Sequence, residues 1–245
     1  MSYKRKFILR LEDVDATYAL TNKAILELME NTSDEDSART KDDIRSLNAQ
    51  GLSWVIVEWN LEVYSRPEYR EEVTVCTWPR EVNSRYVWRD FEMFCRGQKI
   101  AAASSKWMIV DLKSKTIIRL GAERLSKYAI SARTALSSQS RKRLSVLEGY
   151  DISRQAIIRQ ADMDLNSHMH NSTYLDLIKE VSQFDARAVR IIFHREVKIG
   201  DEIFVKMKAQ NNWQFIAITN ANNDAYTLVE QSIQRRRLST YATLR

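Results

Sequence analysis

Side chains that can do acid–base chemistry are concentrated between positions 162 and 174 of this 245-residue chain. The stretch reads Asp-Met-Asp-Leu-Asn-Ser-His-Met-His-Asn-Ser-Thr-Tyr and holds two of the chain's three histidines. It leads into a segment with the apolar periodicity of a buried helix. The first backbone N–H groups of a helix have no partner within the helix. Acids, bases and amides at such a helix start are what an acyl-transfer site needs.

The spacing of Asp164, Asn166 and His168 is the chemically useful part of this stretch. In an extended backbone, residues two apart point the same way, so the three side chains would converge. Asp162, by contrast, is more typical of a turn or a helix cap. His170 and His194 also fit structural or surface roles better than catalysis.

Composition restricts the classes of protein that fit. Hydrophobic residues make up 44% of the chain, whereas glycine (5) and proline (2) are scarce, which favours long strands and helices around a large core. Cys76 and Cys95 are expected to be reduced core thiols, and with the three histidines they give no metal-site spacing. We therefore predict no metal. The motifs of α/β serine hydrolases, P-loops and dinucleotide sites are absent from the sequence.

The net charge of +6 raises the question of an anionic partner. The basic clusters at 141–143 and 235–237 are not interleaved with aromatic residues, so nucleic acid is not expected. An acidic carrier protein is the functional option that we retain. The N-terminal residues do not predict a secretory signal, and no apolar run reaches membrane-spanning length. A cytoplasmic protein without a membrane span is expected.

Hydrophobic periodicity predicts two helices, at 21–31 and 171–187, with Asn171 as the N-cap of the second. Residues 32–45 are expected to form a loop with a short helix. Alternating and β-branched patterns predict the strands. The predicted strands are 52–64, 71–79, 84–95, 99–111 and 115–120 in the first half, and 189–197, 202–209, 213–220 and 225–235 in the second.

An internal repeat relates the two halves. Positions 10, 13 and 15 (Arg, Asp, Asp) precede their counterparts 159, 162 and 164 by 149 residues each. The fold class predicted is α+β, with two units side by side, each an antiparallel sheet wrapped around a long helix. The predicted divisions are a first domain at 1–130, a linker at 131–149 within a Ser- and Arg-rich crossing segment at 121–149, and a second domain at 150–245.

These features together resemble the acyl-acyl-carrier-protein thioesterases, which have a double (tandem) hotdog fold. The resemblance covers nearly the whole chain and rests on the order of its motifs. The matching residues are Trp54-Val, Val63-Tyr-Ser-Arg-Pro67, Thr77-Trp78, Arg89-Asp90, Ser105-Lys-Trp107-Met-Ile-Val, the D-x-D-x-N-x-H run from Asp162 to His168 with Asn171 and Tyr174, and Phe193-His-Arg-Glu196.

The resemblance implies hydrolysis of fatty acyl-acyl carrier protein in fatty acid biosynthesis, giving free fatty acid and carrier protein. It implies a site in the second domain and an acyl pocket in the first. Glu196 is then the general base on water, and Asn166 and His168 hold that water or the carbonyl, with Asp164 orienting them. The amides near His170 and Asn171 would stabilise the oxyanion. The only prosthetic group expected is the carrier's own phosphopantetheine, so no cofactor is predicted for this chain.

Two departures from the family pattern are visible in the sequence. The first of two consecutive asparagines before the helix is replaced by His170, and a cysteine that often follows the glutamate is replaced by Val197. A cysteine nucleophile therefore cannot act from that position. In the first half, Thr17 and Ala19 align with Asn166 and His168, which predicts that only the second half is catalytic.

Three rival functions stay open at this point. The same fold could act on acyl-CoA, could hydrate or dehydrate acyl thioesters, or could bind an acyl thioester without catalysis. The combination of Asn166, His168 and Glu196 fits hydrolysis better than dehydration or simple binding. The oligomeric state expected is a monomer, in which the two halves form a pseudo-dimer, or a homodimer of such chains.

Overall fold

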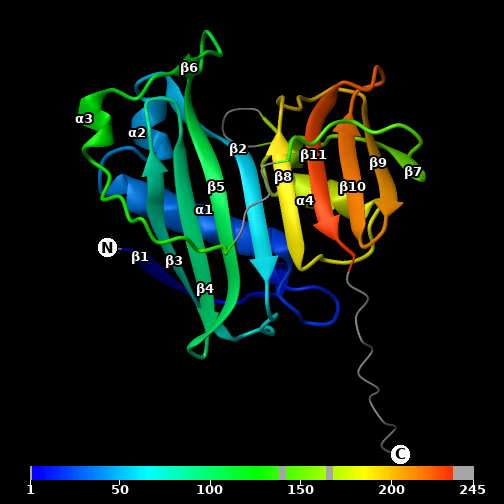
Figure 1. Cartoon of the computed structure of the whole chain (residues 1–245), viewed down its shortest axis with the longest axis horizontal. Helices are drawn as coiled ribbons and strands as arrows, with labels where there is room; N and C mark the ends of the chain where they lie inside the picture. The colour runs from blue at the N-terminus through cyan, green and yellow to red at the C-terminus, as the bar shows by residue number, and fades with distance from the viewer. Residues whose placement is uncertain (1, 138–141, 164–167, 234–245) are drawn as a thin grey trace, which may run out of the picture.

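The strands of the two halves form one continuous antiparallel sheet in the computed structural model, which describes residues 2–137, 142–163 and 168–233. Among those residues, ten strands follow the order β1-β3-β4-β5-β2-β8-β11-β10-β9-β7, and an eleventh, β6, pairs with β5. Figure 1 shows the first-half strands and the second-half strands side by side, joined where β2 meets β8. The predicted α+β fold is confirmed, and the two sheets are joined edge to edge rather than only packed together.

The strand predictions are confirmed at most positions, with shifts at the ends. The first half contains β1 (Tyr3–Ile8), β2 (Leu52–Val63), β3 (Glu72–Val82), β4 (Val87–Cys95), β5 (Gln98–Asp111) and β6 (Ile117–Ile118). The second contains β7 (Ile152–Ala156), β8 (Ala188–Phe193), β9 (Ile203–Gln210), β10 (Trp213–Thr219) and β11 (Ala225–Ser232). The predicted strand 115–120 is wrong for most of its length, because residues 111–116 form the turn that leads into β6.

Both helix predictions had the wrong length. Helix α1 (Asn22–Ala38) continues well beyond position 31, because polar side chains in its second half bond within the helix. Thr32 Oγ1, for example, donates to the carbonyl of Leu28. Its N-cap is Thr21, whose side chain accepts from the Ala24 N–H. Two short helices, α2 (Ile44–Asn48) and α3 (Ala122–Leu125), follow in the first half.

Helix α4 (Thr173–Lys179) is much shorter than the predicted span 171–187. Residues beyond it do not continue the helix. The carbonyls of Asp185 and Ala186 instead accept hydrogen bonds from the guanidinium of Arg66. That backbone is turned towards the first half and cannot continue a helix. The predicted N-cap is also wrong: Ser172 stands at that position, with helical dihedral angles and no side-chain cap bond.

The sequence repeat is visible in the backbone. A one-turn 3-10 helix precedes α1 at Leu11–Asp13 and α4 at Gln160–Asp162, and an acid closes each turn by accepting from the N–H three residues earlier. A β-bridge then joins Val14 to Leu20 in the first half and Met163 to Met169 in the second. Each residue of the second bridge lies 149 positions after its counterpart, which is the offset found in the sequence.

One hydrophobic core runs through both halves under the sheet. It includes Met29 of α1, Trp59 of β2, Phe91 of β4, Ile178 of α4 and Ile191 of β8. In β2 and β8, residues 58 to 62 pair with residues 192 to 188. The core is therefore shared across the junction, and burial of this apolar surface stabilises the two halves as one body.

The segment between the halves crosses the outer face of the first-half sheet. Its anchor is Asp90, a fully buried carboxylate that accepts from the Ala135 N–H at 2.8 Å and from Ser104 Oγ at 2.7 Å. Trp78 Nε1 donates to the carbonyl of Arg133 in the same segment. A buried charge is stable only when it is paired and hydrogen-bonded, and Arg80 Nε, 3.1 Å from Asp90, supplies the counter-charge.

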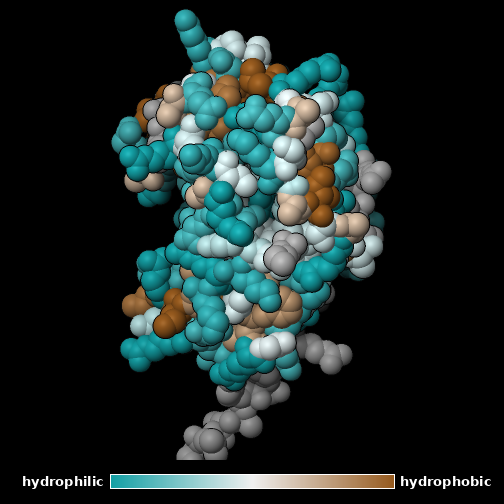
Figure 2. Space-filling model, turned by 90° about the vertical axis from the view of Figure 1, so that its left-hand side faces the viewer, coloured by the Kyte–Doolittle hydropathy of each residue, from teal (hydrophilic) through white to brown (hydrophobic). Residues whose placement is uncertain are grey.

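Hydrophilic residues dominate the end of the first half that is turned to the viewer in Figure 2, and hydrophobic ones form small separate groups there. Such scattered apolar residues are usual on a protein surface. None of the helices formed by the described residues has the length and apolar character to cross a membrane.

Asp15 provides a test of how much the first-half turn contributes to stability. Its Oδ1 accepts from the N–H and Oγ1 of Thr17 and from the Ala19 N–H, at 2.6 to 3.2 Å. Asp15→Ala should lower the free energy of unfolding by roughly 1–2 kcal/mol, since several hydrogen bonds to a partly exposed carboxylate are lost. Asp15→Asn keeps one acceptor oxygen and should be milder. Urea denaturation of the three proteins gives the values, and equal stability of Asp15→Ala and wild type would contradict this role.

Candidate active site

His168 and Glu196, two of the predicted catalytic residues, lie in contact. Nε2 of His168 is 2.9 Å from Oε2 of Glu196, and the two side chains are 16% and 34% exposed. His168 stands just before the bridge residue Met169, whose N–H donates to the carbonyl of Val197. This backbone hydrogen bond fixes the turn that carries the imidazole next to the segment that carries the carboxylate.

Strand register explains why a first-half element also reaches this pair. Ile192 near the end of β8 pairs with Glu58, so the chain beyond β8 runs along the start of β2. Trp54 near that start pairs with Ile109 of β5. The turn after β5 therefore projects towards Glu196, and Nζ of Lys115 in this turn lies 3.2 Å from His168 Nε2 and 3.8 Å from Glu196 Oε2.

Sequence reasoning missed Lys115. The turn itself could have been recognised from Asp111, whose side chain accepts from the N–H groups of Lys113 and Ser114. These hydrogen bonds lower the pKa of Asp111, and those from Ser114 contribute most. Turn chemistry of this kind is readable from a sequence. The sequence does not show towards which side of the molecule the turn projects, because that direction depends on strand pairing between the halves.

His168 and Glu196 both line a cavity of about 220 Å³. Its walls come from the start of β2, the end of β5, helix α4 and the segment after β8. Tyr174 of α4 lies in this wall, edge-on to Phe193 with 5.1 Å between ring centroids. Burial raises the pKa of Tyr174 to about 12.

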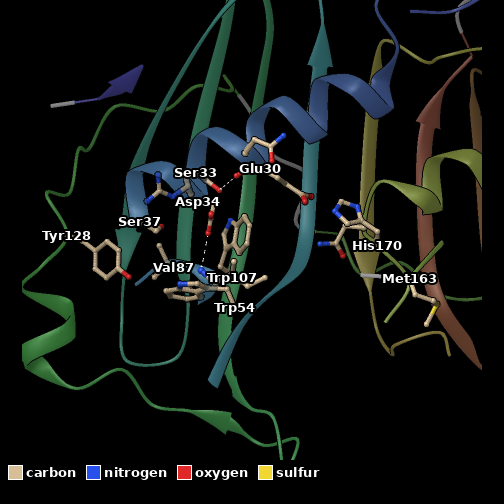
Figure 3. Close-up of a pocket in the computed structure, with 14 residues that line it drawn as sticks. Glu30, Ser33, Asp34, Ser37, Trp54, Val87, Trp107, Tyr128, Met163 and His170 are labelled. Carbon is tan, nitrogen blue, oxygen red and sulfur yellow. Dashed lines mark hydrogen bonds between the residues drawn. The ribbon is translucent and has the colours of Figure 1, made fainter. Parts of the chain in front are cut away.

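A second cavity, of about 490 Å³, lies between α1 and the first-half sheet and reaches second-half residues at one end. Figure 3 shows Trp54, Trp107 and Val87 beneath the helix, with Tyr128 at one end of the cavity and His170 and Met163 at the other. Polar side chains of α1, among them Glu30 and Asp34, line the opposite side. Trp54 and Asn171 belong to the walls of both cavities, so the two cavities adjoin at these residues.

The backbone N–H groups of His170 and Asn171 were both predicted to stabilise the oxyanion, and they differ in their hydrogen bonds. The His170 N–H donates to the carbonyl of Asp162 at 3.0 Å and is therefore occupied. Its imidazole is held too, since Nδ1 lies 2.9 Å from Ser172 Oγ, which donates to Glu27 of α1. Within the part of the chain that the structure describes, the Asn171 N–H has no hydrogen-bond partner. Asn171 is thus the better candidate donor to a developing oxyanion.

The remaining predicted residues divide into two groups. Asp164 and Asn166 lie outside the described residues. Asp162 has the structural role that its sequence context indicated, because it accepts from the Arg159 N–H and pairs with the Arg159 guanidinium. These bonds lower the pKa of Asp162, and the side-chain hydrogen bond from Arg159 contributes most.

The first half has a cavity at its own copy of the turn, lined by residues that include Asp15, Thr17, Ala19 and Arg66. This cavity lies at the first-half counterpart of the turn that carries His168. Arg66 is bound to acceptors in both halves, among them the carbonyl of Leu20 at 2.7 Å and Oδ1 of Asn22 at 2.8 Å. Ala19 stands where the second half has His168, so the imidazole is absent from this copy of the turn.

Comparisons with family models and with individual known proteins point to the same family. The model of the acyl-ACP thioesterase N-terminal domain matches residues 1–128, and the model of the C-terminal domain matches residues 148–234. Two chloroplastic oleoyl-acyl carrier protein thioesterases of Arabidopsis thaliana are 24% and 23% identical over 82% and 83% of this chain. The chain spans about three fifths of the length of these relatives, 61% and 62%.

Solved structures show the same fold over nearly the whole chain. The 12:0-ACP thioesterase from Umbellularia californica superposes with a TM-score of 0.84 at 15% identity, covering 94% of this chain and 96% of its own. An acyl-ACP thioesterase from Bacteroides thetaiotaomicron gives a TM-score of 0.82 at 19% identity, covering 94% and 97%. The hotdog fold predicted from the sequence is thereby confirmed.

Cys76 and Cys95 should be unreactive thiols in the folded protein. Both are buried in the first half, and burial is the main cause that raises the pKa of each. Because the thiolate is the nucleophile, alkylation by iodoacetamide at pH 8 should be at least about tenfold slower than in urea-unfolded chain. Mass spectrometry over time measures both rates. Rapid labelling of the native protein would show that one of these thiols is accessible.

Proposed function

Because the chain belongs to the acyl-ACP thioesterase family, we propose that it hydrolyses the thioester of fatty acyl-acyl carrier protein. The products are free fatty acid and acyl carrier protein, which places the reaction in fatty acid biosynthesis. The observation that carries the proposal is the contact between the Glu196 carboxylate and the His168 imidazole, at a cavity that adjoins one of about 490 Å³. A base beside an imidazole, next to room for an acyl chain, suits hydrolysis of an acyl thioester.

In the proposed reaction Glu196 takes a proton from water, and the water oxygen bonds to the thioester carbon. The carbonyl oxygen becomes an oxyanion, for which the Asn171 N–H is the proposed donor. The C–S bond then breaks with its electron pair going to sulfur, and the proton held by Glu196 passes to the thiolate. His168 orients the carboxylate at 2.9 Å. Asp164 and Asn166 keep their predicted roles of orienting the imidazole and holding water or carbonyl.

We assign the acyl chain to the cavity of about 490 Å³ between α1 and the sheet. The ring centroids of Trp54 and Trp107 are 6.5 Å apart in an edge-on arrangement, and with Val87 they give this cavity an apolar side. An acyl chain lying there would remove this surface from water, which favours binding. In this division residues 1–130 supply the acyl pocket, 131–149 link the halves, and 150–245 carry the catalytic residues. His170, at the mouth of the cavity, would contact the chain near its carbonyl end.

The proposed location is the cytoplasm, and two reduced buried thiols fit a reducing compartment. The paired β2 and β8 strands already join two hotdog units in one chain. A monomer is therefore sufficient for the proposed site, and a homodimer of such chains is the alternative. Light scattering at assay concentration separates the two states.

Removal of the base and of the imidazole tests the proposal. Glu196→Gln should lower kcat by about 10²–10⁴-fold, because the amide cannot take the proton from water. His168→Ala should lower kcat by roughly 10²-fold through loss of orientation. The measurement is free thiol released from acyl carrier proteins of several chain lengths, with the same acyl groups on CoA in parallel.

Glu202→Gln is the matched control for the base, because Glu202 is an exposed carboxylate of the same half that contacts Gln155. Release from the carrier thioester by wild type and by this control, with little from the two site variants, is the expected result. Faster release from acyl-CoA at equal acyl chain would favour the CoA thioesterase. Tight binding of acyl thioesters with no thiol release at any chain length would indicate a protein that binds acyl thioesters without hydrolysing them.

Salt dependence tests the carrier as the partner. The chain carries a formal net charge of +6, and an acidic carrier would be attracted to it. Raising KCl from about 50 to 500 mM should raise KM for acyl carrier protein several-fold, because salt screens charges beyond a few ångströms. KM for a small uncharged thioester with the same acyl group should stay constant. An unchanged KM for the carrier substrate would contradict electrostatic steering.

A further inference from the structure

Lys115 belongs to the first half, yet its ammonium group lies at the second-half site. Its backbone is fixed by the turn after β5: the Lys115 N–H donates to the carbonyl of Asp111, and the Asp111 N–H donates to the carbonyl of Thr116. The Asp111 carboxylate also accepts hydrogen bonds from the N–H and Oγ of Ser114, which complete the turn. The position of the Lys115 stem is therefore set by hydrogen bonds independent of its charged end.

Three charged or titratable groups meet at the end of this side chain. Lys115 Nζ is 3.2 Å from His168 Nε2 and 3.8 Å from Glu196 Oε2, and the latter two atoms are 2.9 Å apart. Nε2 has a single in-plane hydrogen-bonding position, so it either donates to the carboxylate or accepts from the ammonium. The shorter contact with the ionised oxygen favours donation to Glu196. Lys115 then acts as the counter-ion of the His168–Glu196 pair.

We propose that Lys115 is a positioning residue of this pair, so that the catalytic site is completed by the first half of the chain. This inference rests on the proposed thioesterase function. The ammonium and the imidazole lie side by side and both contact Oε2 of Glu196, so together they restrain the carboxylate. A carboxylate held in one place stays aligned with the water that it deprotonates, and this alignment is what a positioning residue contributes to the rate.

The size of the effect follows from exposure. The Lys115 side chain is 48% exposed and that of Glu196 is 34% exposed, so solvent screens their attraction. Removing the ammonium should accordingly cost less activity than removing the base. We expect kcat to fall about tenfold in Lys115→Met, which keeps a stem of similar length and removes charge and donors.

The same lysine could instead dock the carrier or the phosphate of its prosthetic group, and the choice of substrate separates the two roles. Each variant is assayed on acyl carrier protein and on the acyl thioester of N-acetylcysteamine, which has neither carrier nor phosphate. A positioning role predicts the same fall in kcat on both, with KM for the small thioester changed less than about twofold. A docking role predicts a higher KM on the carrier substrate and no change on the small one.

Lys113→Met is the matched control, because it removes an equal charge from the same turn, where only the Lys113 backbone has a hydrogen bond to Asp111. It should keep wild-type kcat on the small thioester. Lys115→Arg keeps charge and donors and should recover kcat to within about fivefold of wild type. Thermal unfolding should be unchanged in all three variants, since both lysine side chains are at the surface.

A readout without substrate completes the experiment. The chain has three histidines, so the imidazole ¹⁵N and ring-proton signals of His168 can be assigned with a His168→Ala variant. Lys115→Met should shift the His168 signals, Lys115→Arg should restore them, and Lys113→Met should leave them unchanged. Unchanged His168 signals, or a loss of kcat confined to the carrier substrate, would overturn the positioning role. Failure of wild type to release thiol from either substrate would instead reject the proposed function.

Discussion

The antiparallel pairing of β2 with β8 is the constraint on which the rest of the structure depends. It joins two units into one sheet and fixes which ends of their strands are neighbours. Because Glu58 pairs with Ile192, the chain that leaves β8 must pass the start of β2, where it brings Glu196. A slip of one residue in this register would turn every side chain of the strand to the opposite face. The shared core beneath the junction, with Trp59 and Ile191 both buried, makes such a slip unfavourable.

Acidic side chains then fix the irregular segments on which the site is built. Asp162 closes the turn before the imidazole, Asp111 builds the turn that presents Lys115, and Asp90 ties the connecting segment to the sheet. Each accepts hydrogen bonds from backbone N–H groups that are not satisfied by a strand or helix, and such groups must find a partner when buried. The loops around the site are therefore held by short-range bonds, while the strands decide only where those loops begin.

Much of this arrangement could be predicted from the sequence, and the failures have physical causes. Alternating patterns located β2 to β5 because such patterns are local, and the 149-residue repeat predicted two equivalent turns. The sequence also grouped His168 with Glu196 through a family resemblance, and the structure places these two in contact. The second helix was predicted too long because its apolar periodicity continues past Lys179, whereas Arg66 engages the following carbonyls. Lys115 could not be found, since its approach requires pairings from β8 through β2 to β5.

The two halves have diverged in chemistry while keeping one backbone plan. Both retain the acid that closes the 3-10 turn, at Asp13 and Asp162, and both retain the bridge that follows. At the position of His168 the first half has Ala19, so its turn lacks an imidazole. What the first half provides instead is the large cavity beneath α1 and the turn that carries Lys115. Since a strand pairing fixes both contributions relative to Glu196, neither half alone would bring Glu196, His168, Lys115 and this cavity together.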